Sequence, residues 1–321
     1  MKKATKEDWG GQVLLSKDGK LLLRKSYGKR DESGAKIDND TRFSLASLAK
    51  PVTAAAILRL VTLGKLSLDD TVGKFFPETP EDKKSLTIRQ LLSHSSGLPE
   101  YHTQGDYVKI SRQEALKLIF TPPLRFTPGT QTAYSNSGFT VLAAILEQVT
   151  GKSYESAMAE LVFKPLGMTH TFFYGQNPTL KNVAVGYGVL NTADNRPSHF
   201  PYTWALRGAG GIITTATDFG LFCDAINGPY LSKSVRDEMN SPIKISGGGP
   251  PVSEGLGWLV GKSRRGTRVA NHGGGSMNGF HTSVVRYIDE GVVLIVLSNR
   301  DGGPDLLDLS REATKVWLKK S

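Results

Sequence analysis

The segment Phe43–Leu60, which reads FSLASLAKPVTAAAILRL, constrains the fold of this chain more than any other stretch. After Pro51 nearly every residue is apolar, so the pattern predicts a helix over 52–64 that has almost no polar face to turn toward water. Such a helix belongs inside a protein, with other elements packed around it. Its first turn nevertheless carries Ser47 and Lys50, and an ammonium group at the mouth of a buried helix requires an explanation.

The position of Pro51 suggests what this lysine does. Proline lacks an N–H and is tolerated in or next to the first turn of a helix, so the helix starts close to Ser47, which is a favourable N-cap residue. Ser47 and Lys50 then lie three residues apart on one face. The helix dipole and the apolar surroundings both disfavour the charged amine and lower its pKa. A neutral lysine can accept the proton of a serine hydroxyl, although an isolated S-x-x-K also occurs by chance.

A second polar element, Tyr134-Ser135-Asn136, stands directly before another apolar segment that predicts a helix over 138–150 and ends at Gly151. A phenol here can relay a proton to a leaving group, and we expect nearby cations to lower its pKa. The Asn136 amide offers both a donor and an acceptor to a substrate amide. Taken alone, the same residues are also typical of an ordinary turn with a helix cap at Ser135 or Asn136.

The third element is the run His272-Gly273-Gly274-Gly275, at the end of a predicted strand. Glycines allow another backbone or a substrate to approach a strand closely and leave a backbone N–H accessible. Such an N–H, paired with that of Ser47, would form an oxyanion hole. A loop or a bulge is the alternative interpretation of the same glycines.

The two ends of the chain predict strands, and the middle predicts helices. Strand patterns occupy 12–16, 20–28, 267–272, 281–288 and 291–299, and Asp18-Gly19 is a hairpin turn signal between the first two. Apolar residues at helical spacing predict helices over 87–94, 112–120, 138–150 and 154–162, and a closing helix over 306–320.

These elements predict an α/β (α+β) protein in which both chain ends form one antiparallel sheet flanked by helices. We expect a single domain over 1–321 that has two lobes. The α/β lobe spans about 1–60 plus 205–321, and a mostly helical lobe spanning about 61–204 is inserted into it.

Composition excludes several other functions. The net charge is +10, but the lysines and arginines are scattered and form no nucleic-acid-binding motif. The longest apolar runs, such as 292–297, are far too short to span a membrane, and the first residues do not resemble a signal peptide. The chain is therefore cytoplasmic as written, or periplasmic or secreted if an export signal was removed. No metal-ligand spacing or cofactor motif links the remaining histidines, which are His94, His102, His170, His199 and His281.

The three elements together resemble a known family. SLAK at 47–50, YSN at 134–136 and HGG at 272–274 follow the order and spacing of serine β-lactamases and penicillin-binding proteins, and are most similar to the class C β-lactamase branch with its D,D-peptidases and family VIII-type carboxylesterases. The resemblance covers roughly residues 11–300. Further stretches that resemble the family are 91–101, 164–173, 208–219 and 255–258.

The resemblance implies a β-lactamase/transpeptidase-like fold and a role for each motif residue. Ser47 resembles the acylated nucleophile, Lys50 its proton acceptor and Tyr134 the residue that shuttles the proton. Asn136 resembles the contact to the substrate amide. In addition, Tyr101 is expected to line the cleft.

The third motif departs from the β-lactamase pattern. The resemblance places the backbone N–H groups of Ser47 and Gly275 in the oxyanion hole, with His272, Gly273 and Gly274 beside the substrate. β-Lactamases of this kind usually carry lysine where His272 stands, and a hydroxyl-bearing residue in place of Gly273. Histidine is mostly neutral at pH 7 and holds a β-lactam carboxylate less well than a fixed cation does. H-x-G variants resemble esterases and some D-amino-acid-directed peptidases.

The sequence thus favours a serine acyl hydrolase that cleaves carboxylic esters through an acyl-enzyme on Ser47. Its partners are small-molecule ester, amide or β-lactam substrates, and the oligomeric state stays open. A D-alanyl-D-alanine peptidase or weak β-lactamase is the alternative within this class. Two further alternatives are an acyltransferase and a catalytically silent receptor for acyl ligands.

Overall fold

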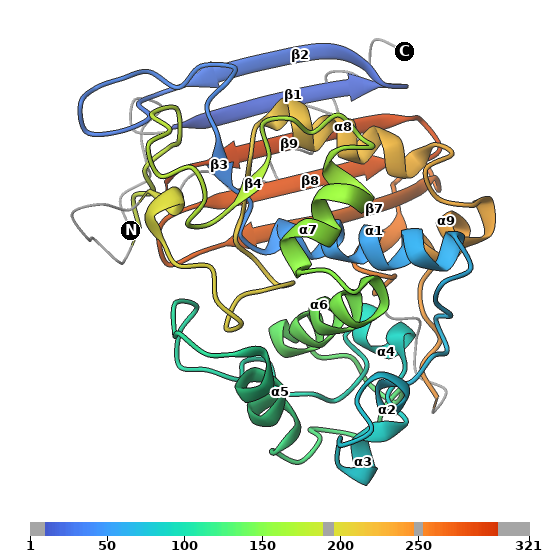
Figure 1. Ribbon diagram of the computed structural model, residues 1–321. Helices are drawn as coiled ribbons and strands as arrows, with labels where there is room; N and C mark the ends of the chain where they lie inside the picture. The colour runs from blue at the N-terminus through green and yellow to red at the C-terminus, as the bar shows by residue number, and fades with distance from the viewer. Residues whose placement is uncertain (1–9, 189–195, 247–252, 301–321) are drawn as a thin grey trace.

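A computed structural model describes residues 10–188, 196–246 and 253–300 of the chain (Figure 1). The main sheet has the strand order β2-β1-β9-β8-β7-β6, and all neighbouring strands are antiparallel. Its strands are β1 (Gly11–Lys17), β2 (Lys20–Tyr27), β6 (Leu259–Lys262), β7 (Arg268–Gly275), β8 (His281–Tyr287) and β9 (Val292–Ser298).

The pairing of β1 with β9 joins the two ends of the chain in one sheet, and this confirms the predicted fold. Gly11 lies opposite Ser298 and Lys17 opposite Val292. The β1–β2 hairpin turns at Asp18-Gly19, whose φ angles of 49° and 74° are both positive. An Asp-Gly pair is favoured in such a turn, because the second residue has no Cβ to clash.

The helices pack on the sheet and extend below it in Figure 1. Helix α8 packs against β1 and β9, and α1 packs against α6. The helix bounds are α1 Ala49–Thr62, α2 Val72–Phe75, α3 Glu81–Lys84, α4 Ile88–Leu92, α5 Arg112–Phe120, α6 Asn136–Thr150, α7 Tyr154–Met158, α8 Ala216–Asn227 and α9 Lys233–Met239. A 3₁₀ turn at Ala46–Leu48 precedes α1, a π turn at Ala159–Phe163 follows α7, and another 3₁₀ turn spans Pro197–His199.

Helix α1 occupies the centre of the molecule, as its composition predicts. Eleven of its residues, from Ala49 to Leu60, are buried, and its apolar side chains belong to the main hydrophobic core. A helix enclosed in this way holds its first turn rigidly against its neighbours. The predicted closing helix over 306–320 lies outside the described residues.

A second, small sheet was not predicted from the sequence. It has the order β3-β5-β4, with β3 Phe43–Ser44, β4 Phe172–Phe173 and β5 Ile212–Thr214. Strands of two or three residues are too short to show an alternating pattern. This sheet matters for the site, because β3 leads directly into the turn that carries Ser47.

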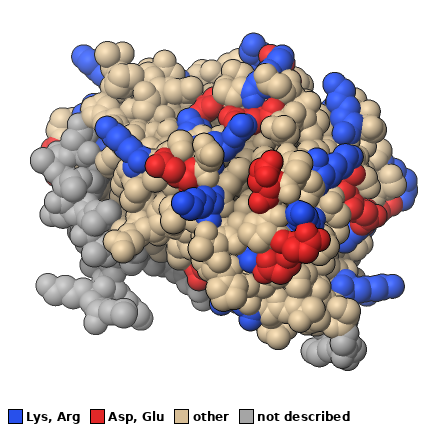
Figure 2. Space-filling model, turned by 60° about the horizontal axis from the view of Figure 1, so that its bottom comes forward, with Lys and Arg blue, Asp and Glu red and all other residues tan. Residues whose placement is uncertain are grey.

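Basic and acidic side chains alternate over the surface shown in Figure 2, which looks onto the lower end of the molecule in Figure 1. That face therefore presents no broad patch of one sign. Within the described residues, no helix combines the length and apolarity that a membrane span requires.

Candidate active site

Ser47 lies in the 3₁₀ turn between β3 and α1. The residue before it, Ala46, has a φ of 48°, an unusual conformation for a residue other than glycine. The N-cap of α1 is Leu48, with no side-chain capping bond, so the prediction that Ser47 caps the helix is wrong. The 3₁₀ turn shifts the start of α1 past Ser47. Its hydroxyl is therefore available to Lys50 and Tyr134.

Lys50 is completely buried, and its amine contacts the serine. Lys50 Nζ donates to Ser47 Oγ at 3.1 Å and to the carbonyl of Ala209 at 3.0 Å. Burial lowers the pKa of Lys50 to about 7, although the charges of Asp106 and Glu100 oppose this shift. A substantial fraction of the amine is therefore neutral near pH 7. This is the property that a proton acceptor for the serine needs.

Tyr134 completes the contacts of the serine hydroxyl. Its hydroxyl donates to Ser47 Oγ at 2.8 Å, and Lys50 Nζ lies 4.7 Å from its ring centroid. The side chain is 37% exposed, and desolvation raises the pKa of Tyr134 above its usual range. The expected lowering by cations is wrong, because desolvation dominates and Glu100 and Asp106 add negative charge nearby. The phenol thus stays protonated and acts as a donor.

Local capping chemistry fixes the segment that carries Tyr134. Ser135 is the N-cap of α6, where its Oγ accepts from the N–H of Gly138 at 2.9 Å. Asn136 is the first residue of this helix, and its N–H donates to the carbonyl of Glu100 at 2.9 Å. The hydroxyl of Tyr101 contacts the side chains of Glu100 and Asn136. The predicted cap is confirmed, and Asn136 and Tyr101 lie together beside Tyr134.

The glycine run belongs to a regular strand and is neither a loop nor a bulge. Strand β7 extends to Gly275, three residues beyond its predicted end, and pairs with β8 along its whole length from Val269. On its other side, β6 pairs with β7 only as far as Asn271. In the described part of the chain, the run from His272 to Gly275 therefore forms an open strand edge.

Gly274 shows why glycine is required at this edge. A Cβ atom there would lie 2.7 Å from the carbonyl oxygen of Leu45 and 3.0 Å from the nitrogen of Ser47. Any other residue would push β7 away from the serine turn, so the predicted close backbone approach is present. Gly275 is the next residue on this strand. The oxyanion hole formed by its N–H and that of Ser47 stays a prediction.

His272 is buried, with 8% of its surface exposed. Its Nδ1 lies 2.7 Å from the carbonyl oxygen of Gly273 and so carries the proton. Burial, together with the nearby charge of Lys50, lowers the pKa of His272 to about 4. The ring is neutral at pH 7, as the sequence predicts. The position at which β-lactamases of this kind usually carry a lysine is thus occupied by a neutral ring.

The sequence profile of the Beta-lactamase family matches residues 5–316. The chain belongs to this family. It is a serine hydrolase of the β-lactamase and penicillin-binding-protein type, and the antiparallel sheet with its flanking helices is the β-lactamase/transpeptidase fold.

Individual relatives agree with this family assignment. The chain is 30% identical to penicillin-binding protein 4* of Bacillus subtilis over 92% of its own length. It spans 69% of the length of that protein, and 37% of several other curated relatives. It is similar to a D-stereospecific amidohydrolase from Streptomyces sp., with 26% identity, a TM-score of 0.77 and coverage of 93% and 91% of the two chains. A penicillin-binding protein of Bacillus halodurans shares the fold, at 22% identity, a TM-score of 0.79 and coverage of 96% and 97%.

Three neighbours of this β-lactamase-family site were not found from the sequence. The Ala209 carbonyl holds Lys50, but a backbone atom leaves no signal in residue identity. Asp106 lies in the loop after Tyr101, where no pattern could be interpreted. His94 follows the end of α4 and contacts Tyr134, with ring centroids 4.7 Å apart.

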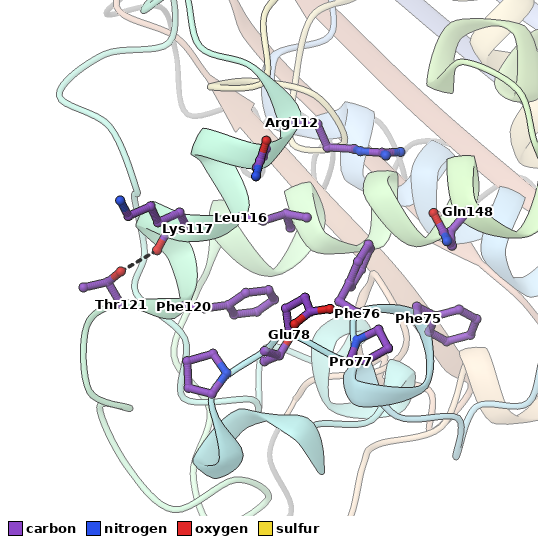
Figure 3. A pocket seen from close by; sticks show the side chains of 13 residues that line it. Phe75, Phe76, Pro77, Glu78, Arg112, Leu116, Lys117, Phe120, Thr121 and Gln148 are labelled. Carbon is purple, nitrogen blue, oxygen red and sulfur yellow. Dashed lines mark hydrogen bonds between the residues drawn. The ribbon is translucent and has the colours of Figure 1, made fainter.

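The structure also has a hollow of about 660 Å³ that is separate from this site (Figure 3). It lies between α5 and the segment after α2, and its apolar lining includes Phe75, Phe76, Leu116 and Phe120. None of its lining residues is a serine, cysteine or histidine. In the described ranges, no group of three or more His, Cys, Asp or Glu side chains is arranged to hold a metal ion.

Proposed function

We propose that this β-lactamase-family protein hydrolyses carboxylic esters through a covalent acyl-enzyme on Ser47. One observation carries the proposal. The Oγ atom of Ser47 is within hydrogen-bond distance of both the Lys50 amine, at 3.1 Å, and the Tyr134 hydroxyl, at 2.8 Å. The hydroxyl therefore has a proton acceptor and a proton relay in direct contact, as an activated nucleophile requires.

The chemistry follows from these contacts. Ser47 Oγ attacks the ester carbonyl carbon while its proton passes to neutral Lys50, and the negative charge on the carbonyl oxygen is held by the N–H groups of Ser47 and Gly275. When the C–O bond of the ester breaks, the proton moves through Tyr134 to the departing alkoxide. Water then attacks the acyl-enzyme by the same route in reverse, releasing the acid and restoring the Ser47 hydroxyl.

The charges around the site support neutral esters as substrates. β-Lactams and peptides ending in D-Ala carry a carboxylate that needs a cation, and His272 is neutral where such a cation would stand. Asp106 and Glu100 place negative charge near Lys50 instead. Asp106 has no ion pair or hydrogen bond with the described residues. A second candidate function, hydrolysis of D-configured amides or D-alanyl peptides, is supported by the similarity to the Streptomyces amidohydrolase.

Two measurements test the proposal together. Incubation with excess p-nitrophenyl acetate should release many equivalents of p-nitrophenol per protein, whereas a silent acyl-ligand receptor releases at most one. Intact-mass analysis after separate exposure to an ester panel, a penicillin and a D-Ala-D-Ala peptide should show faster acylation by the esters than by the other two. Adducts with the penicillin or the peptide alone would favour a weak β-lactamase or a D-alanyl peptidase. An acyltransferase would instead transfer the acyl group to an added alcohol or amine.

The negative charges near Lys50 predict that the site discriminates between two nearly isosteric esters. Mono-p-nitrophenyl succinate carries a carboxylate where p-nitrophenyl butyrate has its terminal methyl group. We expect kcat/KM for the butyrate to be at least about tenfold higher, which corresponds to about 1.4 kcal/mol. Asp106→Asn should narrow this ratio several-fold, and added salt should narrow it as well. Glu81→Gln, on exposed α3, serves as the control and should leave the ratio unchanged. Equal rates for both esters would contradict the argument.

A further inference from the structure

We propose that His94 is a positioning residue that holds Tyr134 against the Ser47 hydroxyl. This inference rests on the function proposed above. His94 follows the end of α4, and only 4% of its surface is exposed. Its polar groups are directed at the tyrosine segment, defined here as residues 133–135. A histidine that only terminated a helix would not need these contacts.

Two hydrogen bonds attach His94 to the residues on either side of Tyr134. The carbonyl of His94 accepts from the N–H of Ala133 at 2.9 Å. Its Nδ1 atom accepts from the N–H of Ser135 at 3.1 Å. The backbone of Tyr134 is therefore fixed at both ends by one residue, and the phenol can swing only by rotation of its own side chain.

Ring contacts restrict that rotation. The imidazole centroid lies 4.7 Å from the Tyr134 ring and 5.3 Å from the Phe139 ring. The amine of Lys50 lies 4.7 Å from the same tyrosine ring. His94 and Lys50 thus flank a tyrosine ring that is 37% exposed, and these two contacts remove some of its rotamers. The 2.8 Å bond from its hydroxyl to Ser47 is thus held by packing as well as by its own strength.

The backbone of His94 is specialised for the same task. Its φ of 55° is positive, a conformation that non-glycine residues seldom adopt but that histidine and asparagine tolerate better than most. In this conformation both the carbonyl and the side chain reach the tyrosine segment. Because Nδ1 accepts a hydrogen bond, the neutral ring carries its proton on Nε2. Burial lowers the pKa of His94 to about 3, so this acceptor persists over the working pH range.

Three substitutions separate the contributions of His94. His94→Asn keeps an acceptor near the position of Nδ1 and tolerates the positive φ, but it lacks the ring. His94→Phe keeps a ring and loses the acceptor, which leaves the Ser135 N–H unsatisfied. His94→Ala loses both, and added imidazole can refill the space. Ile119→Val, in the core of α5, is a control that loses stability without touching the site.

We expect His94→Phe and His94→Ala to lower kcat for p-nitrophenyl butyrate about 30-fold or more, with KM within threefold of the parent value. The kcat of His94→Asn should lie within about fivefold of the parent value, and added imidazole should raise the kcat of His94→Ala several-fold. In a Tyr134→Phe background, His94→Phe should have less than a threefold further effect, because the group that His94 positions is already absent. A purely structural role would not give this loss of coupling.

The rate at which a p-nitrophenyl phosphonate labels Ser47, followed by intact mass, separates the two proposals. Suppose that the parent is labelled at Ser47 and turns over esters, and that His94→Phe and His94→Ala are labelled no more slowly than Ile119→Val. This result would overturn the positioning role alone. Equal losses from His94→Phe in the parent and Tyr134→Phe backgrounds would overturn it as well. A parent that neither labels nor turns over esters would overturn both proposals. Should His94→Phe fail to fold, His94→Ala with and without imidazole decides the question.

Discussion

Replacing Ser47 with alanine is expected to abolish ester turnover while leaving the fold intact. The substitution removes the oxygen atom that both Lys50 and Tyr134 contact, so no acyl-enzyme can form. Loss of the nucleophile costs about 10⁶-fold in kcat in a serine protease with a Ser-His-Asp triad, and we expect a loss of roughly 10⁴-fold or more here. Steady-state hydrolysis of p-nitrophenyl acetate measures the loss, and intact mass should show no acyl adduct.

The control for this variant is Ser67→Ala, a serine in the turn after α1 that caps the N–H of Asp69. It should retain full turnover. The melting temperature of Ser47→Ala should stay close to that of the parent, because Ser47 is half-buried in a 3₁₀ turn and caps no helix. Turnover at the parent rate in Ser47→Ala would refute a serine mechanism at this position.

Local chemistry explains which parts of this fold were predictable. Helix α5 occupies the predicted residues 112–120, because Ser111 and Glu114 form a capping box at its start. Helix α6 ends at Gly151 as predicted, where a φ of 67° suits glycine. The proximity of Ser47 and Lys50 was equally predictable, since it follows from helical spacing and from Pro51 alone.

Features that depend on distant segments could not be predicted in this way. Helices α2 and α3 have four residues each, which is too few to show a helical period. The pKa of Tyr134 is raised by desolvation and, less strongly, by Glu100 and Asp106, and nothing in the residues next to the tyrosine indicates these causes. The wrong N-cap assignment of Ser47 has a similar origin. The turn there includes a positive φ at Ala46 that alanine seldom adopts.

The second large effect concerns the pH dependence that Lys50 imposes on catalysis. We expect kcat/KM for a neutral ester to rise tenfold per pH unit up to pH about 7 and then to level off, as the Lys50 amine loses its proton. No decline should follow below pH about 10, because the pKa of Tyr134 is raised above its usual value. Lys50→Arg, which stays charged, should lose about 10³-fold or more. Lys83→Arg, at another buried lysine, should keep its activity.

The same lowering of the Lys50 pKa reduces the free energy of unfolding of the protein. The pKa of Lys50 falls from 10.5 to about 7 on folding, so between these values the unfolded chain holds a proton that the folded protein lacks, and stability rises with pH. Below pH 7 the full cost is present, on the order of 5 kcal/mol. Lys50→Met removes this cost. It also leaves the Ala209 carbonyl without its hydrogen-bond partner, which destabilises the folded protein by about 1–3 kcal/mol.

Lys50→Met should therefore be inactive and yet more stable than the parent, by roughly 2 kcal/mol at pH 6. Its free energy of unfolding should also lose the rise that the parent shows between pH 7 and 10. Urea unfolding at several pH values measures both effects, with Lys83→Met as the matched control at a lysine that is buried but ion-paired with Asp82. An inactive Lys50→Met variant that is less stable than the parent and keeps its pH dependence would mean that the amine is held as a cation. A cation at Lys50 could not accept the proton of Ser47.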